Sequence, residues 1–568
     1  MSIKSREIKN LGIAIDHPMQ QILKLLPASG FSEQISLIDK TYKSSLLERR
    51  NQAEADKEQR KFESIDEGRS HVCVPGVWII CVSTDYKSAC EASLKKSTNG
   101  NSAPKEYVRA AISALVDEVN GAFASLDDIK SDDPDVKVAV EQCREMHGYA
   151  SGELNRTLGT IDDANSLSHL PAQVHELKNW LSATSAYQQT CIDGFPAGEL
   201  QDKMQARLES AKRMTSNALT IVGKVSSFAP VLHGSGSRLL QEEEEENHSA
   251  NGIPAWVPES ERRVLESRAT KEFTPNVTVA KDGTGDFKTI SDALSHLPAK
   301  YDGRQAIATC KILNLSNKKK LLAFSAIVTT LYEAAIGDGF MAVAMGFQNT
   351  AGAAKHQAVA LRVQSDRAIF LNCRMEGYQD TLYALCHRQF YRGCLILGTI
   401  DFIFGDAAAV FQNCILTVLR PLDNQQTIVL AQGRTLPQET TGFVLHNCRI
   451  VPDPALAKPD PPPKQPFRNY LGRPWQKYSR TAIMESEIGD FIDTQGYMPW
   501  DGDFALKTLT YSEYSNTGGG GGTDKRVNWP GVKVISRAEA ASFTPATFIQ
   551  GGDWIPKTNT PVRLGLFA

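Results

Sequence analysis

A short phrase that recurs along the second half of the chain constrains the fold more than any other feature. The phrases GFQNTA, IFLNCRM, VFQNCIL and VLHNCRI place Asn349, Asn372, Asn413 and Asn447 at spacings of 23, 41 and 34 residues. A repeat of about 20–25 residues is typical of one coil of a parallel β-solenoid, in which equivalent residues stack in ladders. We therefore expect a buried Asn ladder at a turn, with Cys and apolar side chains in the interior. The alternative is chance recurrence of a four-residue phrase.

Two aspartates lie within the repeat region, in the stretch GYQDTLYALCHRQFYRGCLILGTIDFIFG. Asp380 and Asp401 are 21 residues apart, and Gln357 precedes Asp380 by 23 residues. Both spacings are close to one coil, and neighbouring coils lie about 4.8 Å apart across a sheet. The spacing predicts that these three residues occupy one face of three successive coils, with Gln379 beside them.

Two neighbouring carboxyl groups suit acid–base and nucleophilic chemistry. When two carboxylates lie this close, one pKa rises and that group stays protonated, while the other remains charged. The pair then supplies a general acid and a nucleophile. Glutamine amides nearby can donate to an oxyanion, and LGRPW offers Arg473 to orient a carboxylate, beside Trp475. No Ser–His pair or metal-spaced His/Cys cluster competes for this role, and the alternative is that both aspartates cap turns.

The first half of the chain has a helical texture. Amphipathic stripes at three- and four-residue steps, with no strand signal between residues 74 and 230, predict an antiparallel bundle of helices. One stripe consists of Val108, Ile112, Leu115, Val119 and Phe123. Four cysteines also fall here, and they are either buried small hydrophobes or two disulfides: Cys81, Cys90, Cys143 and Cys191.

Composition divides the chain into four parts. We expect a polar arm over residues 1–70, a helical bundle over 71–230, an acidic linker over 231–270 and a solenoid over 271–568. The linker holds SRLL and ERRVL, which are either protease sites or plain polar sequence. Residues 271–568 hold 31 Lys and Arg against 26 Asp and Glu, a mildly basic balance that suits a polyanionic partner. We see neither a membrane-spanning apolar run nor a signal-peptide core.

Long blocks of the chain resemble a known family, the plant-type pectin methylesterases. The blocks are KDGTGDFKTISDAL, GFQNTAGAAKHQAVALR, GYQDTLY, RQFYRGC, GTIDFIFG, AQGR, LGRPWQKYSRT, EYSNTGGGGG, RVNWPG and FIQGGDWIP. CVSTDYKSAC and NWLSATSAYQQTCIDGF resemble, more loosely, the inhibitor domain that often precedes the enzyme. The resemblance implies an all-α antiparallel four-helix bundle followed by an all-β right-handed parallel β-helix.

The resemblance also implies an activity, hydrolysis of methyl esters of polygalacturonate (pectin) with release of methanol and without metal or organic cofactor. It assigns the nucleophile to Asp401 and the acid, later the base, to Asp380. It makes Gln357 and Gln379 the oxyanion donors and Arg473 the residue that binds nucleophile and substrate. Trp475 matches an aromatic subsite residue whose ring can pack on a sugar.

Other implications concern disulfides, partners and location. The resemblance implies bridges Cys81–Cys90 and Cys143–Cys191, and a further bridge Cys394–Cys414. It implies secretion to the cell wall, where four N-x-[S/T] sites would allow glycosylation, and a processing protease that acts at SRLL or ERRVL. Pectin (methylated homogalacturonan) is the expected partner, together with a contact of the inhibitor domain with this or another esterase, and no nucleic acid.

One segment departs from the family. Residues 304–336 do not match, and the family's substrate-binding Thr would fall at Ile327, with Thr329 and Thr330 out of register. Asp406 stands where Asn is usual, and residues 452–467 are rich in proline. Loss of most of a coil would expose the stack and disturb early subsites. The rival interpretations are another enzyme of the same polymer, a lyase or polygalacturonase, or an inactive or inhibitor-only chain.

Overall fold

The computed structural model describes residues 75–98, 102–164, 167–227, 277–278, 286–287, 306–308, 313–315 and 334–567. The described residues all belong to one unit of the chain, Val74–Ala568. The predicted arm at 1–70, the linker with SRLL and ERRVL, and Ile327, Thr329 and Thr330 lie outside the described residues.

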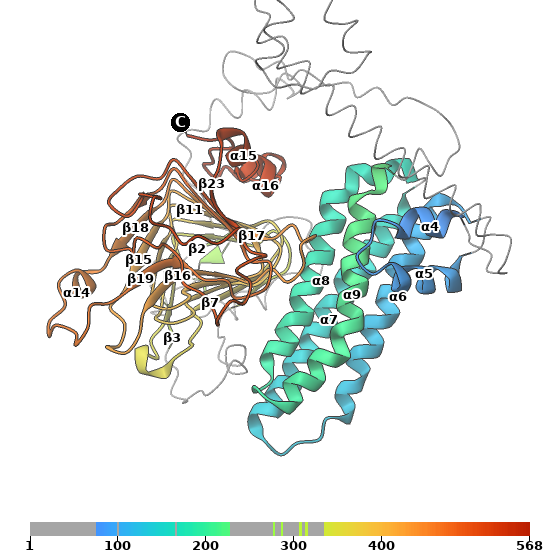
Figure 1. The fold of residues 1–568 in the computed structure, drawn as a ribbon, viewed down its shortest axis with the longest axis horizontal. Helices are drawn as coiled ribbons and strands as arrows, with labels where there is room; N and C mark the ends of the chain where they lie inside the picture. Colours follow the sequence, from blue (N-terminus) through green and yellow to red (C-terminus); the bar gives the residue numbers. More distant parts are fainter. Residues whose placement is uncertain are drawn as a thin grey trace, which may run out of the picture. The chain divides into compact units, whose positions relative to one another are not determined.

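The first part of this unit is helical, as predicted (Figure 1). Four long helices pack against one another: α6 (Pro104–Ala124), α7 (Pro134–Asp163), α8 (Val174–Gly194) and α9 (Glu199–Gly223). Two short helices precede them, α4 (Pro75–Cys81) and α5 (Lys87–Ser97). The predicted stripe from Val108 to Phe123 is buried along α6, which fixes the face that α6 turns to its neighbours. We call this part the helical domain.

Two disulfides fix the helical domain, Cys81–Cys90 and Cys143–Cys191. The first joins the end of α4 to α5, and the second joins α7 to α8. Both pairings implied by the resemblance are therefore present.

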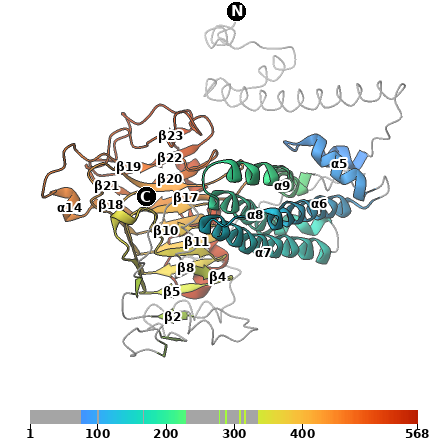
Figure 2. The same ribbon diagram turned by 90° about the horizontal axis from the view of Figure 1, so that it is seen from below.

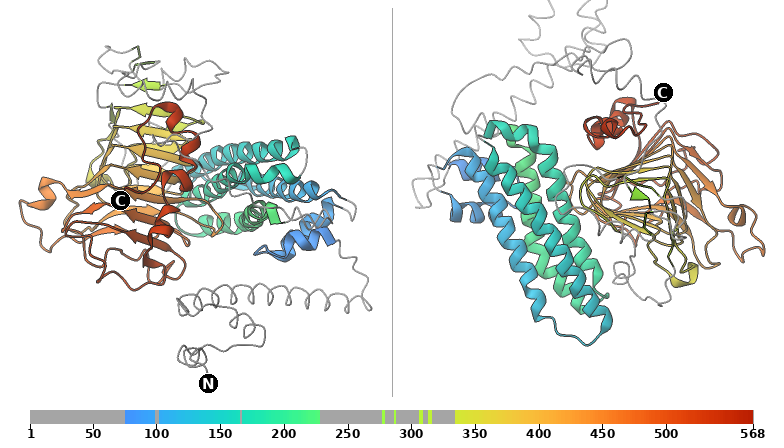
Figure 3. Two further views of the ribbon diagram at one scale, coloured as in Figure 1. Left: turned by 90° about the horizontal axis from the view of Figure 1, so that it is seen from above. Right: turned by 180° about the vertical axis from the view of Figure 1, so that it is seen from behind.

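The second part is a parallel β-helix of three sheets, stacked coil on coil (Figures 2 and 3). The ten-stranded sheet consists of β1 (Val277–Thr278), β2 (Ala306–Ala308), β5 (Met341–Val343), β8 (Ala368–Leu371), β11 (Arg388–Arg392), β14 (Ala408–Gln412), β17 (Gly442–His446), β20 (Arg480–Met484), β22 (Thr510–Tyr514) and β23 (Val532–Val534). The six-stranded sheet consists of β4 (Ala334–Ile336), β7 (Leu361–Gln364), β10 (Leu382–Ala384), β13 (Ile403–Gly405), β16 (Thr427–Gln432) and β19 (Asn469–Gly472). The seven-stranded sheet consists of β3 (Leu313–Leu315), β6 (Gly346–Asn349), β9 (Arg374–Glu376), β12 (Leu395–Gly398), β15 (Ile415–Val418), β18 (Arg449–Pro452) and β21 (Glu487–Ile488).

The interior of the β-helix is built from in-register ladders. Phe370, Tyr391 and Phe411 pair across β8, β11 and β14. Their rings stack, with centroids 4.9 and 4.5 Å apart. Apolar residues that recur once per coil therefore form one continuous core.

Residues 304–336, which were expected to lack most of a coil, keep part of the stack. β2 pairs with β1 and β5, and β3 pairs with β6, all in parallel. β4 pairs with β7. The three sheets therefore extend into residues 304–336.

The recurring asparagines act differently from the prediction. Asn372, Asn413 and Asn447 have positive φ of 53–55° at the turn that precedes the seven-stranded sheet, a conformation that Asn tolerates better than most residues. Asn447 donates to Asn413 across one coil, at 3.3 Å, but Asn372 is exposed. Asn349 is not part of this ladder, because it ends β6 and donates to the carbonyl of Val359. The prediction of a buried four-Asn ladder was therefore wrong in burial and in membership.

The cysteines beside these asparagines form a second ladder. Cys373, Cys394, Cys414 and Cys448 occupy equivalent positions before β9, β12, β15 and β18, and all four are buried free thiols. The Cys394 thiol donates to the carbonyl of Phe370, and the Cys414 thiol donates to the carbonyl of Tyr391. The expected bridge Cys394–Cys414 is absent, because in-register side chains point the same way and each thiol has a backbone acceptor.

Candidate active site

Strand register brings the two aspartates together at the start of the six-stranded sheet. Leu382 pairs with Ile403, so Asp380 and Asp401 occupy equivalent positions on adjacent coils. The backbone N–H of Asp380 donates to the carbonyl of Ile400 at 3.0 Å. Each aspartate is 4% exposed and has a positive φ, 63° for Asp380 and 49° for Asp401. Such strained backbone is concentrated at functional sites, where the surrounding structure holds it in place.

Arg473 binds one of the two carboxylates. It follows β19, and its backbone N–H donates to the carbonyl of Leu430, one coil earlier. Its Nε donates to Oδ1 of Asp401 at 2.9 Å, and its Nη2 donates to Oδ2 of the same carboxylate. This two-point contact fixes the plane of the Asp401 carboxylate.

The other carboxyl group has no such partner. Burial raises the pKa of Asp380 well above its usual range, and the neighbouring Asp401 raises it further, while Arg473 opposes the shift. The Asp380 carboxyl has no hydrogen bond to any residue that the structure describes. Asp380 is therefore the group of the pair that holds its proton more strongly, while Asp401 is the group that the arginine orients.

The two predicted glutamines lie beside the pair. Gln357 forms a parallel bridge with Gln379, which directly precedes Asp380. The prediction placed Gln357 in line with Asp380, so its register is shifted by one residue. Within the described part of the chain neither amide has a hydrogen-bond partner, and both are only partly buried. Their N–H groups are therefore free to donate to a bound group.

Trp475 lies on an aromatic surface outside the six-stranded sheet. Tyr383 and Phe404 stack with centroids 4.3 Å apart, and the Trp475 ring stands edge-on to Phe404 at 5.7 Å. A Cβ at Gly433 would lie 2.6 Å from Cε3 of Trp475. Only glycine therefore lets the indole approach this close.

Sequence reasoning missed two groups at this site. The ring of Trp500 covers the Arg473 guanidinium, 4.2 Å from Cζ to the ring centroid. The lone aromatic in the polar loop MPWDGD was the available signal. Asp193, at the end of α8, was also missed, because nothing local in the sequence links it to the β-helix.

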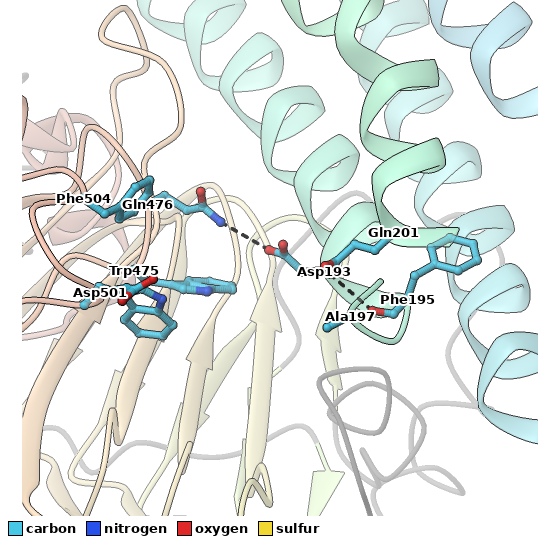
Figure 4. Close-up of a pocket in the computed structure, with 9 residues that line it drawn as sticks. Asp193, Phe195, Ala197, Gln201, Trp475, Gln476, Asp501 and Phe504 are labelled. Carbon is cyan, nitrogen blue, oxygen red and sulfur yellow. Dashed lines mark hydrogen bonds between the residues drawn. The ribbon is translucent and has the colours of Figure 1, made fainter. Parts of the chain in front are cut away.

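A pocket of about 530 Å³ joins these two groups (Figure 4). Trp475, Gln476, Trp500, Asp501 and Phe504 line it from the β-helix, and Asp193, Phe195, Ala197 and Gln201 line it from the helical domain. Asp193 accepts hydrogen bonds from Gln189 at 2.8 Å and from Gln476 at 3.5 Å. Burial raises the pKa of Asp193 to about 6.

Two features are absent from the described residues. None of their helices is long and apolar enough to cross a membrane. Nor do they contain a group of three or more His, Cys, Asp or Glu side chains that could hold a metal ion. The three parallel sheets and the Asp380–Asp401–Arg473 geometry define a β-helix protein with a paired-carboxyl, arginine-bound centre.

Comparison with known proteins identifies the family. The pectinesterase family matches residues 314–552, and the plant invertase/pectin methylesterase inhibitor family matches residues 78–221. The chain is 41% identical over 517 residues to the putative pectinesterase/pectinesterase inhibitor 45 of Arabidopsis thaliana. The matched region covers 86% of this chain and 84% of the relative. It is 38% identical over 460 residues to pectinesterase 1 of Citrus sinensis, and the matched region covers 76% of this chain and 77% of the relative.

A solved pectin methylesterase from carrot is also similar, with 42% identity, coverage of 52% of this chain and 100% of that chain, and a TM-score of 0.48. The chain belongs to the pectinesterase/pectinesterase inhibitor family. It is thus a member of a carboxylic ester hydrolase family with an inhibitor-like N-terminal region, and the resemblance drawn from the sequence is confirmed.

Proposed function

We propose that the chain hydrolyses methyl esters of polygalacturonate, releasing methanol and free carboxylates, and so modifies the plant cell wall. The observation that carries the proposal is the Asp380–Asp401–Arg473 geometry. It pairs a carboxyl of raised pKa with a carboxylate that an arginine holds by two hydrogen bonds.

The first half of the proposed reaction forms an acyl-enzyme. Asp401 attacks the carbonyl carbon of the ester, and the carbonyl oxygen becomes an oxyanion. The amides of Gln357 and Gln379 donate to it. As the C–O bond to the methoxy group breaks, Asp380 gives its proton to that oxygen and methanol leaves.

The second half restores both carboxyl groups. Asp380, now a carboxylate, takes a proton from water, and the hydroxyl adds to the acyl carbon. The bond to Asp401 breaks, Asp401 leaves as a carboxylate, and Asp380 keeps the proton for the next turnover. Every step uses side chains of this chain alone.

The aromatic surface supports the substrate assignment. Trp475 and Trp500 present ring faces and edges beside the site, as pyranose rings require.

The helical domain is proposed to be an antiparallel four-helix bundle that inhibits the site. Asp193 and Phe195 line the pocket opposite Trp475, which supports a contact that blocks access to substrate. We further propose division at 1–70, 71–230, 231–270 and 271–568, secretion, and release of the inhibitory domain by a protease acting in the linker.

Methanol release from highly methylated pectin tests the proposal. The full chain is assayed before and after cleavage at a specific protease site placed in the 231–270 linker, beside the variant Asp401→Ala. We expect low release before cleavage, high release after separation of the domains, and none from the variant. Unsaturated or shortened chains without methanol would indicate a lyase or polygalacturonase instead.

A further inference from the structure

A buried arginine in the β-helix is held in place by its own domain. Arg388, the first residue of β11, has a side chain that is 3% exposed. Its Nε donates to Oδ1 of Asp366 at 3.0 Å, and its Nη2 donates to Oδ2 at 2.6 Å. Although burial opposes ionisation, Arg388 lowers the pKa of Asp366 to about 2. Asp366 thus fixes one edge of the guanidinium.

The other edge of this guanidinium, whose Nη1 also donates to Oε1 of Gln550 at 3.4 Å, binds a carboxylate from the helical domain. Nη1 of Arg388 donates to Oε1 of Glu176 at 3.0 Å, and Nη2 donates to Oε2 at 2.6 Å. Nη2 of Arg367 donates to the same Oε1 at 2.6 Å. Two arginines therefore hold the Glu176 carboxylate, Arg388 through both oxygens and Arg367 through Oε1. Glu176 also lies in the first turn of α8, where the helix dipole favours an acid.

Two further pairs also place the basic side chain on the β-helix and the carboxylate on the helical domain. Arg362 donates to Glu145 of α7 at 2.9 Å, and His387 lies 3.3 Å from Glu153 of α7. Arg156–Asp338 has the opposite polarity, at 2.9 Å. The Glu176 contact differs from these because two arginines bind the Glu176 carboxylate. One of them, Arg388, is already oriented by Asp366 of its own domain.

The arginine pair is separate from the catalytic centre. Asp380 and Asp401 precede β10 and β13, whereas Asp366, Arg367 and Arg388 follow β7 and β10. The two groups thus lie at opposite ends of the strands of the six-stranded sheet. Changes in the arginine pair can therefore alter docking without touching the catalytic groups.

We propose that Arg388 and Arg367 form a preorganised carboxylate-binding socket by which the catalytic domain recognises an inhibitory helical domain, with Glu176 as its ligand. The inference rests on the proposed function and deepens it, because it names the contact that holds the inhibitory domain. A partner that fits this socket carries an acid in the first turn of the helix equivalent to α8. A buried charge that loses its partner is costly, so loss of Glu176 should weaken docking on the order of 10²-fold.

The test uses the full chain, folded and then cleaved in the 231–270 linker. Exchange of the helical domain against labelled copy measures association, and methanol release measures activity separately. We compare the parent, Glu176→Gln and Arg367→Met. Arg367 is 41% exposed, so its replacement carries little risk to folding. The matched control is Glu141→Gln, because Glu141 of α7 is exposed and, among the described residues, pairs within its own helix, with Arg144.

The expected result is about 10²-fold weaker association for Glu176→Gln, a smaller loss for Arg367→Met and parent-like association for Glu141→Gln. The parent should also lose affinity with added salt more steeply than Glu176→Gln. Parent-like association of Glu176→Gln and Arg367→Met overturns the socket, as does a cleaved parent whose domains do not associate. Absence of methanol from every separated form would refute the proposed activity and leave the association result to decide the socket.

Discussion

In the helical domain, side chains that contact one another are often three or four positions apart, whereas in the β-helix they are about one coil apart. Glu145 and Tyr149 of α7 illustrate the first case, at 2.9 Å. Asp380 and Asp401, 21 positions apart and adjacent in register, illustrate the second. Chemistry in the helical domain thus depends on helix periodicity, while chemistry in the β-helix depends on coil length.

The cysteines of the two domains also play different structural roles. The helical domain uses four as two disulfides between segments that would otherwise separate. The β-helix keeps four as stacked thiols, because hydrogen bonds between coils already hold its segments together. A stack of coils therefore needs no covalent bridge at this position.

The largest expected effect is the loss of activity when Asp401, which the register of the β-helix places beside Asp380, is replaced. Asp401→Ala removes the group that Arg473 orients, and we expect methanol release to fall at least about 10⁴-fold, as when a nucleophile is removed from a coupled catalytic set. Alanine tolerates the positive φ at position 401 less well than aspartate, so we expect a modest loss of thermal stability beside the loss of activity. Asp423→Ala is the control, since Asp423 is exposed and, in the part of the chain that the structure describes, pairs with Arg420 alone. Substantial release from Asp401→Ala would contradict the assignment of the nucleophile.

The next effect compares the cysteines of the two domains. The Cys143–Cys191 bridge closes a loop with a sequence separation of 48 residues. Its removal by the double variant Cys143→Ala/Cys191→Ala should cost the helical domain about 4 kcal/mol of unfolding free energy. Cys394→Ala removes a buried thiol but no covalent bond, so we expect about 1 kcal/mol. Guanidinium unfolding followed by circular dichroism measures both, and a larger loss for Cys394→Ala would overturn the comparison.

Much of this architecture follows from the sequence, and the exceptions have physical causes. The helices, the parallel coils and the proximity of Asp380 and Asp401 were predictable, since periodicity and coil length set them, whereas Arg473 was offered by the LGRPW motif and the family resemblance. The Asn ladder was misjudged because αL turns, rather than buried amides, select Asn372, Asn413 and Asn447. Contacts between domains, such as that of Asp193 with Gln476, leave no periodic signal.

A smaller effect concerns the geometry of the arginine. Arg473→Lys keeps the charge but loses the two-point contact with Asp401 and the stacking under Trp500. We expect kcat to fall about 10²-fold with a smaller change in KM, because the nucleophile loses its orientation. Arg468→Lys is the control, since Arg468 also pairs with an acid, Asp493, and covers a ring, Tyr470. Equal loss in both variants would show a general effect of replacing arginine.

The smallest expected effect is a pH dependence of the association between the two domains. Burial raises the pKa of Asp193 to about 6, against about 3.9 for a free aspartate. The groups that face it are Gln189 and Lys212 of the helical domain and Gln476 of the β-helix. Below about pH 4 the carboxyl is protonated whether the domain is docked or released, so its contribution to docking is fully present. As pH rises from about 4 to about 6, only the released form ionises freely, and docking weakens.

We therefore expect the association constant of the cleaved domains to fall about tenfold or more between pH 4 and pH 6. In Asp193→Asn this fall should be absent, because the amide does not titrate. Asp202→Asn should behave as the parent, since Asp202 lies exposed in the first turn of α9. A variant that keeps the parent's pH dependence would assign the effect to another titrating group at the contact, such as His387 beside Glu153. The pH profile thus decides whether the pocket wall at Asp193 is a part of the docking contact or only adjoins it.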